Sequence, residues 1–313
     1  MARGQGARSQ MALAFETTYG TAPVSGYTRM PFAPPVSLSS EQPLLASELL
    51  GFGRDPVAPI KDAVTADGNV TVPIDLDAFG FWLKGTFGSP VTTGTTTFTH
   101  VFTSGAFVLP SMSIEIGMPE IPSFSMYSGA RVDTLSWTMQ RSGPLTASVG
   151  LIAQGETRAT STQAGTPAAI TLQRFGHFNG SVKRGGTLLG NVVSASVNYS
   201  NTLDRIETIR ADGKIDGVDP GIAALTGDIV VRFADTALLD QATNGSPAAF
   251  EFSWSLGASK TLTVAVPVVY LPVPRREISG PGAIEATFAW QAAQQANGDP
   301  MVTVTLVNSV SAY

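Results

Sequence analysis

The acidic residues Asp212, Asp216 and Asp219 form the cluster in this sequence that most suggests a ligand site. Carboxylates at short spacing can bind calcium, but the ordered twelve-residue frame that ends in Glu is missing here. Asp75 and Asp77 form a second acidic pair, directly before an apolar segment of helical length. Carboxylates at that place stabilise a helix N-terminus, because the helix dipole is positive there. Neither cluster therefore predicts a catalytic site.

The two histidines, His100 and His177, lie beside aromatic residues and have no further ligands at metal-binding spacing. A zinc site needs three or four such ligands, so packing within strands or loops is the interpretation we favour. The chain has no cysteine, which excludes disulfides and thiolate metal sites. It also has no phosphate-binding Gly-rich loop and no Gly-x-Ser-x-Gly elbow. Without a nucleophile, base and orienting group, the sequence predicts no enzyme, cofactor or metal.

The composition is poor in charge and rich in apolar residues. At 313 residues, two domains of ordinary size are expected. Only 14% of residues are charged and 43% are hydrophobic. Either much of the surface is buried against other subunits, or Ser, Thr, Asn and Gly supply the surface polarity of a β-rich protein. The net charge of −5 offers no basic excess for binding phosphates, so tight nucleic-acid binding is not expected.

The sequence also lacks the signals that direct a chain to a membrane. Its first residues have no apolar core of a secretory signal. The longest apolar runs are too short to cross a bilayer as helices. No membrane span is therefore predicted.

An internal repeat with an offset of 159 residues organises the chain. At this offset residues 68–72 (GNVTV) align with residues 227–231 (GDIVV), and Val36 aligns with Ala195. With a small shift, residues 134–137 (TLSW) match residues 287–290 (TFAW). A duplicated module without catalytic groups indicates a building block.

Alternating apolar residues predict strands in both halves. In the first half these are residues 69–75, 98–102, 111–116, 131–140 and 145–153. In the second half they are residues 180–183, 187–199, 229–233, 249–256, 262–271, 283–291 and 301–308. Asp77 is expected to cap a helix that carries Trp82 and ends at Gly88, and Asp235 to cap one that ends at Gly245.

These elements predict a mainly β fold of two tandem β-sandwich domains, each with one short flanking helix and a long inter-strand loop. We expect an N-terminal arm at residues 1–26, a first domain at 27–155, a Ser/Thr/Ala/Gly linker at 156–170 and a second domain at 171–313.

Two long loops, at about residues 41–67 and 201–226, carry most of the clustered cations. Long loops inside compact domains are uncommon and usually functional. Solvation is one interpretation of these cations, and pairing with acidic residues of a neighbouring subunit is the other, which we favour. They are Arg54, Lys61, Arg205, Arg210 and Lys214, with Arg275 and Arg276 following a Pro-rich turn elsewhere.

The pattern resembles the major tail tube proteins of long non-contractile-tailed (siphovirus-like) bacteriophages. It rests on residues 16–21 (ETTYGT), the strand that follows Gly-Asn or Gly-Asp and enters a short helix, and the long loop before it. Residues 194–245 carry the resemblance most clearly, and it covers nearly the whole chain. It implies rings whose inner strands join into a barrel, and stacking loops at residues 45–66 and 204–225. The implied contact residues are Glu48, Arg54, Asp55, Lys61, Arg205, Glu207, Arg210, Lys214 and Asp216.

The resemblance also implies partners and a location. The chain would assemble with itself into the tail tube, the channel through which DNA passes without specific binding during ejection. Because both halves carry the loop, strand and helix, trimeric rings with pseudo-six-fold symmetry are favoured over hexamers with an outer second domain. Other tail proteins would bind the tube ends, and the protein would belong to the virion after synthesis in the host bacterial cytoplasm.

Two alternatives remain open. One is a different virion structural role, such as a tube terminator, a hub or a decoration protein. The other is a tandem β-sandwich binding module in which tryptophans stack on sugars. Apolar neighbours favour core positions for the tryptophans instead; they are Trp82, Trp137, Trp254 and Trp290.

Overall fold

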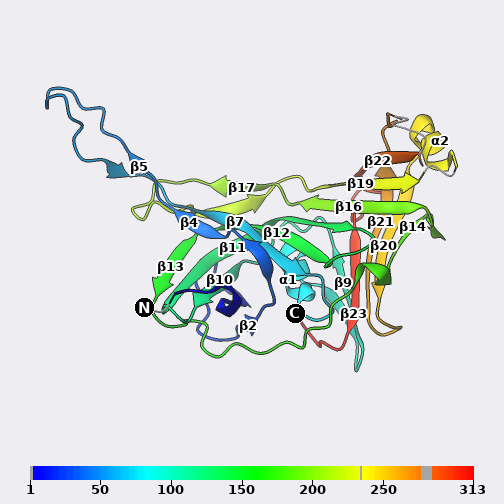
Figure 1. Cartoon of the computed structure of the whole chain (residues 1–313), viewed down its shortest axis with the longest axis horizontal. Helices are drawn as coiled ribbons and strands as arrows, with labels where there is room; N and C mark the ends of the chain where they lie inside the picture. The colour runs from blue at the N-terminus through cyan, green and yellow to red at the C-terminus, as the bar shows by residue number, and fades with distance from the viewer. Residues whose placement is uncertain (1–2, 233–234, 276–283) are drawn as a thin grey trace.

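The computed structural model describes residues 3–232, 235–275 and 284–313, and Figure 1 shows their arrangement. The expected strand residues Phe233 and Ala283, and the cation Arg276, lie outside the described residues. The fold is mainly β, as predicted, and the strands form two large antiparallel sheets that share one long strand. No helix among the described residues is long and apolar enough to cross a membrane.

The smaller sheet belongs to the first half of the chain. Its strands, in spatial order, are β2 (Thr28–Arg29), β1 (Gln10–Phe15), β10 (Met112–Met118), β11 (Ser123–Met139) and β13 (Gly155–Ala159). The first part of β11 lies in this sheet, and its second part crosses into the larger sheet. This strand therefore joins the two layers at a corner.

The larger sheet runs through both halves of the chain. From the shared strand β11 it continues in one direction through β12 (Thr146–Ala153) and β7 (Thr65–Pro73) to β3 (Ala33–Val36) and β4 (Ser39–Glu41). In the other direction it continues through β16 (Val192–Ser200), β19 (Ala224–Arg232) and β22 (Glu285–Ala292) to the end of β21 (Thr261–Tyr270).

Beyond β21 the sheet folds over to form the second layer of the second half. One branch holds β20 (Ala248–Ser255), β14 (Gly180–Arg184) and β15 (Thr187–Leu188), and the other holds β23 (Thr303–Asn308), β9 (Phe98–Thr103) and β8 (Val91–Gly94). The hairpin of β8 and β9 therefore comes from the first half but extends a layer of the second half, beside β23 in Figure 1.

The strands form where the sequence alternates between buried and solvated residues. In β22, for example, Ala286, Phe288, Trp290 and Ala292 are buried and the residues between them are exposed. Such a strand has one face for the core and one for solvent. The buried faces of both halves meet in one continuous hydrophobic cluster, which includes all four tryptophans.

The repeat found in the sequence is present in the structure. Strand β19 begins and ends 159 residues after β7. Val36 lies opposite Val70, and Ala195 lies opposite Ile229, so the pairing with the preceding strand is also repeated.

The match between residues 134–137 and 287–290 is wrong as an equivalence. Residues 287–290 lie in β22, which pairs with β19 as β12 pairs with β7. Residues 134–137 lie in the next strand, β11. Both segments are half-buried strands that end in a buried tryptophan, and this shared alternation explains the false match.

The two helices flank the sheets as predicted, but both predicted N-caps are corrected. Helix α1 (Phe79–Phe87) ends at Gly88, and α2 (Ala237–Asn244) ends at Gly245 in the left-handed conformation. Asp77 does not cap α1, because Ala78 occupies the N-cap position and no side chain makes a cap hydrogen bond there. Asp75 instead holds the turn that leads into the helix, since its Oδ1 accepts the N–H groups of Asp77 (2.8 Å) and Ala78 (2.6 Å).

At the second helix the predicted cap is wrong by one residue, because Thr236 occupies the N-cap position without a side-chain cap hydrogen bond and Asp235 precedes it. Asp235 Oδ1 accepts the N–H of Ala237 at 3.0 Å, which satisfies one of the free donors at this helix start.

The expected arm and linker both contain strands. Residues Met11 to Ala14 of β1 are buried between β2 and β10, so this part of residues 1–26 is built into the sheet. Glu16 holds the following turn, since its carboxylate accepts hydrogen bonds from Ser113 Oγ (2.6 Å) and from the N–H of Gly20 (2.9 Å). Strand β13 occupies the start of the expected linker and pairs with β11.

Candidate assembly surfaces

The first long loop (residues 42–64) extends from the body of the molecule, between β4 and β7. Only a short hairpin of β5 (Leu44–Leu45) and β6 (Ile60–Lys61) organises its base. Figure 1 shows the loop beyond β5 reaching away from both sheets. Its exposed side chains include a set of large apolar ones, and an exposed apolar patch of this kind marks an interaction site. These are Leu44, Leu45, Leu49, Leu50, Phe52 and Ile60.

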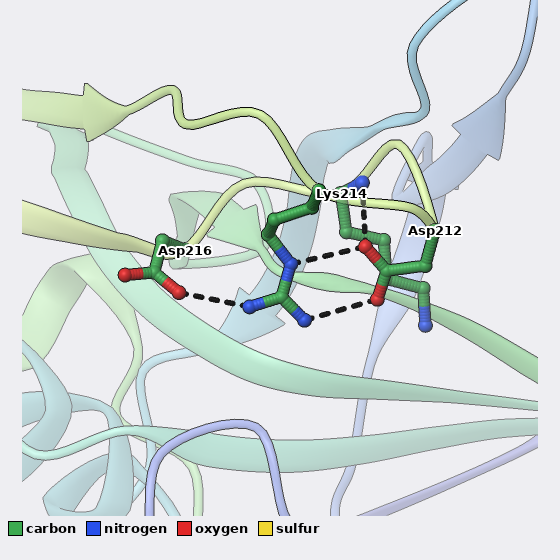
Figure 2. Close-up of polar contacts among 4 residues, drawn as sticks. Asp212, Lys214 and Asp216 are labelled. Carbon is green, nitrogen blue, oxygen red and sulfur yellow. Dashed lines mark hydrogen bonds and ion pairs between the residues drawn. The ribbon is translucent and has the colours of Figure 1, made fainter.

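The second long loop (residues 201–223) has the same length and place in its repeat, between β16 and β19, but it folds back. Strands β17 (Leu203–Ile206) and β18 (Gly217–Pro220) pair over four residues each next to its base. At its turn, Arg210 donates to Asp212 from Nε (3.0 Å) and to Asp216 from Nη1 (2.8 Å). Figure 2 shows Asp212 and Asp216 on opposite sides of this guanidinium group. The hydrogen bonds from Arg210 hold the pKa of the Asp212 carboxyl well below its usual range.

We call the group of Arg210, Asp212 and Asp216 the arginine clamp, and it bears on the hypothesis that the second loop binds calcium. Two of the three aspartates face the guanidinium group of Arg210, and Asp219 lies in β18 opposite Asp204. Within the described part of the chain no group of three metal-binding side chains converges. The two carboxylates therefore serve as partners of an arginine in this structure.

The second loop also contacts the first repeat, at the place where the first loop enters β7. Arg205 forms an ion pair with Asp67 of β7, and the N–H of Val64 donates to the carbonyl oxygen of Gly213 at 2.8 Å. A small cavity of about 140 Å³ remains there, lined by Arg205, Glu207 and Lys214 from the second loop and by residues 63–66, where the first loop enters β7. The second loop therefore supports the end of the first loop, where that loop enters β7.

The predicted contact residues thus fall into two groups. Glu48, Arg54, Asp55 and Lys61 are exposed on the first loop. Among the ion pairs of the described residues, Arg205 and Arg210 find partners in their own chain, unlike the expected pairing with a neighbouring subunit. The structure does not bring the two groups together into one cluster.

The histidines and tryptophans occupy buried structural positions. His100 Nδ1 lies 2.8 Å from Thr92 Oγ1, and its Nε2 lies 2.9 Å from the carbonyl oxygen of Val310. His177 begins a short 3-10 helix (η2, His177–Asn179) and is also buried. All four tryptophans are at most 6% exposed, so none presents a ring face to a sugar.

One contact that the sequence did not reveal joins the two repeats. The second part of β11 pairs with β16 from Thr134 opposite Ser200 to Met139 opposite Ala195. In the first repeat the strands equivalent to β16 are β3 and β4, and they pair with β7. Among the described residues no strand covers their other edge. The offset of 159 shows which strands are equivalent, since it aligns Val36 with Ala195, but it does not show that β11 pairs with β16.

Comparison with known proteins decides the family. The sequence model described as "Phage tail tube protein" matches residues 6–292, which cover the first repeat, most of the second and both loops.

The chain belongs to the phage tail tube protein family.

Membership of the tail tube family agrees with the surfaces described above. It makes the chain a structural component of the virion tail. No curated protein matches the chain. The features shared by both repeats, namely the loop, the following strand and the flanking helix, all lie inside the matched residues.

Proposed function

We propose that this chain is the repeating subunit of a tail tube, and that it assembles head to tail into rings around a channel for DNA. The pairing of β11 with β16 carries the proposal, because it joins two repeats edge to edge in one continuous sheet within a single chain. An uncovered strand edge is a liability for a monomer. A head-to-tail contact that closes into a ring removes such edges.

The duplication supports trimeric rings with pseudo-six-fold symmetry. Each chain supplies two repeats, at about residues 27–155 and 171–313, so three chains present six copies of the same strand, loop and helix.

The two loops are proposed to lie between successive rings. The first loop, with its exposed Glu48, Arg54, Asp55 and Lys61 and its apolar side chains, would reach the neighbouring ring. The second loop, with Arg205, Glu207, Arg210, Lys214 and Asp216, would support the first loop at its base and offer the receiving surface. An apolar contact at this place would explain why large side chains of the first loop are exposed in the single chain.

The charge of the chain suits passage of DNA without binding. Affinity for DNA comes largely from cations that neutralise phosphates. With 24 acidic and 19 basic residues, a net charge of −5, the chain has no cationic excess to offer to DNA. Other tail proteins would bind the two tube ends, and synthesis would take place in the host bacterial cytoplasm before the protein enters the virion.

Negative-stain electron microscopy across a concentration series tests the proposal. Stacked hollow rings are expected, and end-on class averages together with the native mass of a ring give the number of chains. Closed rings that never stack would favour a terminator or hub. A species that stays monomeric at high concentration would contradict ring assembly and favour a binding module.

A further inference from the structure

Residues of the first repeat cover the edge of the second repeat at β16. Trp137 lies opposite Val197, and Met139 lies opposite Ala195, at the edge of β16. Both side chains are almost fully buried, and the ring of Trp137 lies 6.4 Å from that of Trp254 in an edge-on arrangement. The contact between the repeats therefore has two parts, a strand ladder and a pair of apolar side chains that close the sandwich.

The first repeat has the same opening, but it is empty. The offset of 159 makes Val36 and Leu38 equivalent to Ala195 and Val197. Beside them opens a cavity of about 1090 Å³ with a largely apolar wall. An apolar cavity of this size next to an uncovered strand edge is a docking site for a further strand. Its lining includes Met11, Met30, Phe32, Val36, Leu38 and Ile116.

The strand that would fill this opening can be identified within the chain. Leu135 of β11 lies opposite Val149, which lies opposite Val70. In the second repeat Ile229, the equivalent of Val70, lies opposite Phe288. Phe288 therefore takes the place that Val149 has in the first repeat.

The residue that takes the place of Leu135 follows from the register of β21 and β22. Tyr270 lies opposite Gln291, and the same register extended by three residues brings Val273 opposite Phe288. Val273 is therefore the equivalent of Leu135, yet it is 60% exposed whereas Leu135 is fully buried.

The backbone at residues 271–275, directly after β21, can pair with a further strand on the side that faces away from β22. Val268 directs its carbonyl oxygen to β22, where it accepts the N–H of Ala293 at 3.0 Å. Because backbone groups alternate along a strand, residues of even number face β22 here and residues of odd number face away. Pro272 and Pro274 both fall on the β22 side, where their missing N–H groups explain why the pairing ends at Tyr270. The free side keeps its donors.

We propose that residues 270–275 of one copy pair antiparallel with β3 and β4 of a second copy, with Val273 opposite Ser40. This register reproduces the pairing of Leu135 with Tyr199 inside the chain. It places Arg275 opposite Leu38, at a cavity whose lining includes the carboxylate of Glu156. The inference rests on the proposed self-assembly and names the contact that would carry it.

Cysteine pairing between two differently labelled chains tests the register. The natural chain has no cysteine, so Ser40→Cys and Val273→Cys each introduce a single thiol. Directly opposite residues of an antiparallel ladder have Cα atoms roughly 4.5 to 5.5 Å apart, which a disulfide can bridge. Mixing the two variants before assembly and oxidising mildly should give a covalent dimer on a non-reducing gel, well above the yield from either variant alone.

A mismatched pair and a mass measurement make the result decisive. Ser40→Cys mixed with Ser259→Cys, an exposed residue in the turn between β20 and β21, is the control and should give little dimer. If rings form by native mass but the Ser40–Val273 pair does not exceed this control, the contact is wrong while self-assembly stands. If every mixture stays monomeric before oxidation, self-assembly fails as well.

A charge at the same place gives an independent readout. Val273→Asp should leave the exposed chain folded, as judged by its melting curve, and should abolish rings at concentrations at which the natural chain assembles. Val91→Asp, at a similarly exposed valine of β8, is the matched control and should still form rings. Equal assembly of both variants would overturn the proposed contact.

Discussion

The hydroxyl of Ser37 accepts a hydrogen bond from the backbone N–H of Asn69 at 2.9 Å. The same contact recurs 159 residues later, where the hydroxyl of Ser196 accepts the N–H of Asp228 at 3.0 Å. A glycine precedes the donor in both places, Gly68 and Gly227, and each lies against the carbonyl oxygen of the serine. The two repeats therefore share individual contacts as well as a pattern of strands.

Both glycines should be intolerant of a side chain. A Cβ at Gly68 would lie 2.4 Å from the carbonyl oxygen of Ser37, and one at Gly227 would lie 2.0 Å from that of Ser196. Because backbone atoms cannot move aside cheaply, Gly68→Ala and Gly227→Ala should each lower the free energy of unfolding by about 2 kcal/mol or more. Urea denaturation measures this loss.

A glycine in open space provides the control for this pair. Gly190 has no heavy atom within 4 Å of an added Cβ, so Gly190→Ala should change the free energy of unfolding by less than about 1 kcal/mol. Equal effects of all three substitutions would show that the close approach of the two strands is not what requires glycine.

The arginine clamp should hold the second loop in its folded-back form. Arg210→Met removes the hydrogen bonds to Asp212 and Asp216, and we expect faster cleavage of residues 203–220 by proteinase K. Arg54→Met is the matched control, since the ion pairs of the described residues do not involve Arg54. Mass spectrometry of the fragments locates the cuts. Unchanged cleavage in Arg210→Met would mean that β17 and β18 alone fix the loop.

Asp75 should make stability depend on pH. Burial raises the pKa of its carboxyl from 3.8 to about 6, and its Oδ2 atom is buried without a hydrogen-bond partner. The folded state thus binds the proton more tightly than the unfolded state. The contribution of Asp75 is complete below about pH 4 and is lost as the pH rises through about 6.

Asp75→Asn isolates that contribution, because its amide oxygen can still accept the N–H groups of Asp77 and Ala78 before α1. Between pH 4 and pH 7 the natural chain should lose up to about 3 kcal/mol more than the variant, as measured by urea denaturation at each pH. Parallel pH profiles for the two chains would place the carboxyl in a more solvated site than the structure shows.

The apolar side chains of the first loop should govern stacking and not folding. Replacing Leu49, Leu50 and Phe52 with Ser should leave melting curves and ring formation unchanged, because all three side chains are exposed in the single chain. Tube length by electron microscopy should fall several-fold. The charge variant Arg54→Ser with Asp55→Ser tests whether ion pairs contribute as well. Tubes of natural length from the apolar variant would contradict the role given to this loop.

Much of the fold could be predicted because alternation is a strong signal. Strands such as β20 and β22 follow apolar residues at every second position, and the glycines after α1 and α2 marked both helix ends. Strand β1 was missed because it is short and Met11 to Ala14 are buried on both faces, so its residues do not alternate. The sequence could not place β9 beside β23 either, since nothing local indicates which distant edge a hairpin will join.

The candidate surfaces were harder to predict than the fold. The length and charge of the loops were visible, but Arg210 meets Asp212 and Asp216 only because the loop turns near Gly213. The apolar cavity beside Val36 and Leu38 exists because no strand covers this edge among the described residues. The sequence of an edge strand does not show whether a neighbouring strand is present.

The pairing of β11 with β16 inside one chain has a kinetic consequence. In a ring of six repeats, every second contact is then intramolecular, and the two partners meet at the high effective concentration that a covalent tether provides. Closing the ring requires an encounter of three bodies instead of six. The rate of nucleation should therefore rise with a lower power of protein concentration than it would for separate single repeats, and rings should persist to greater dilution.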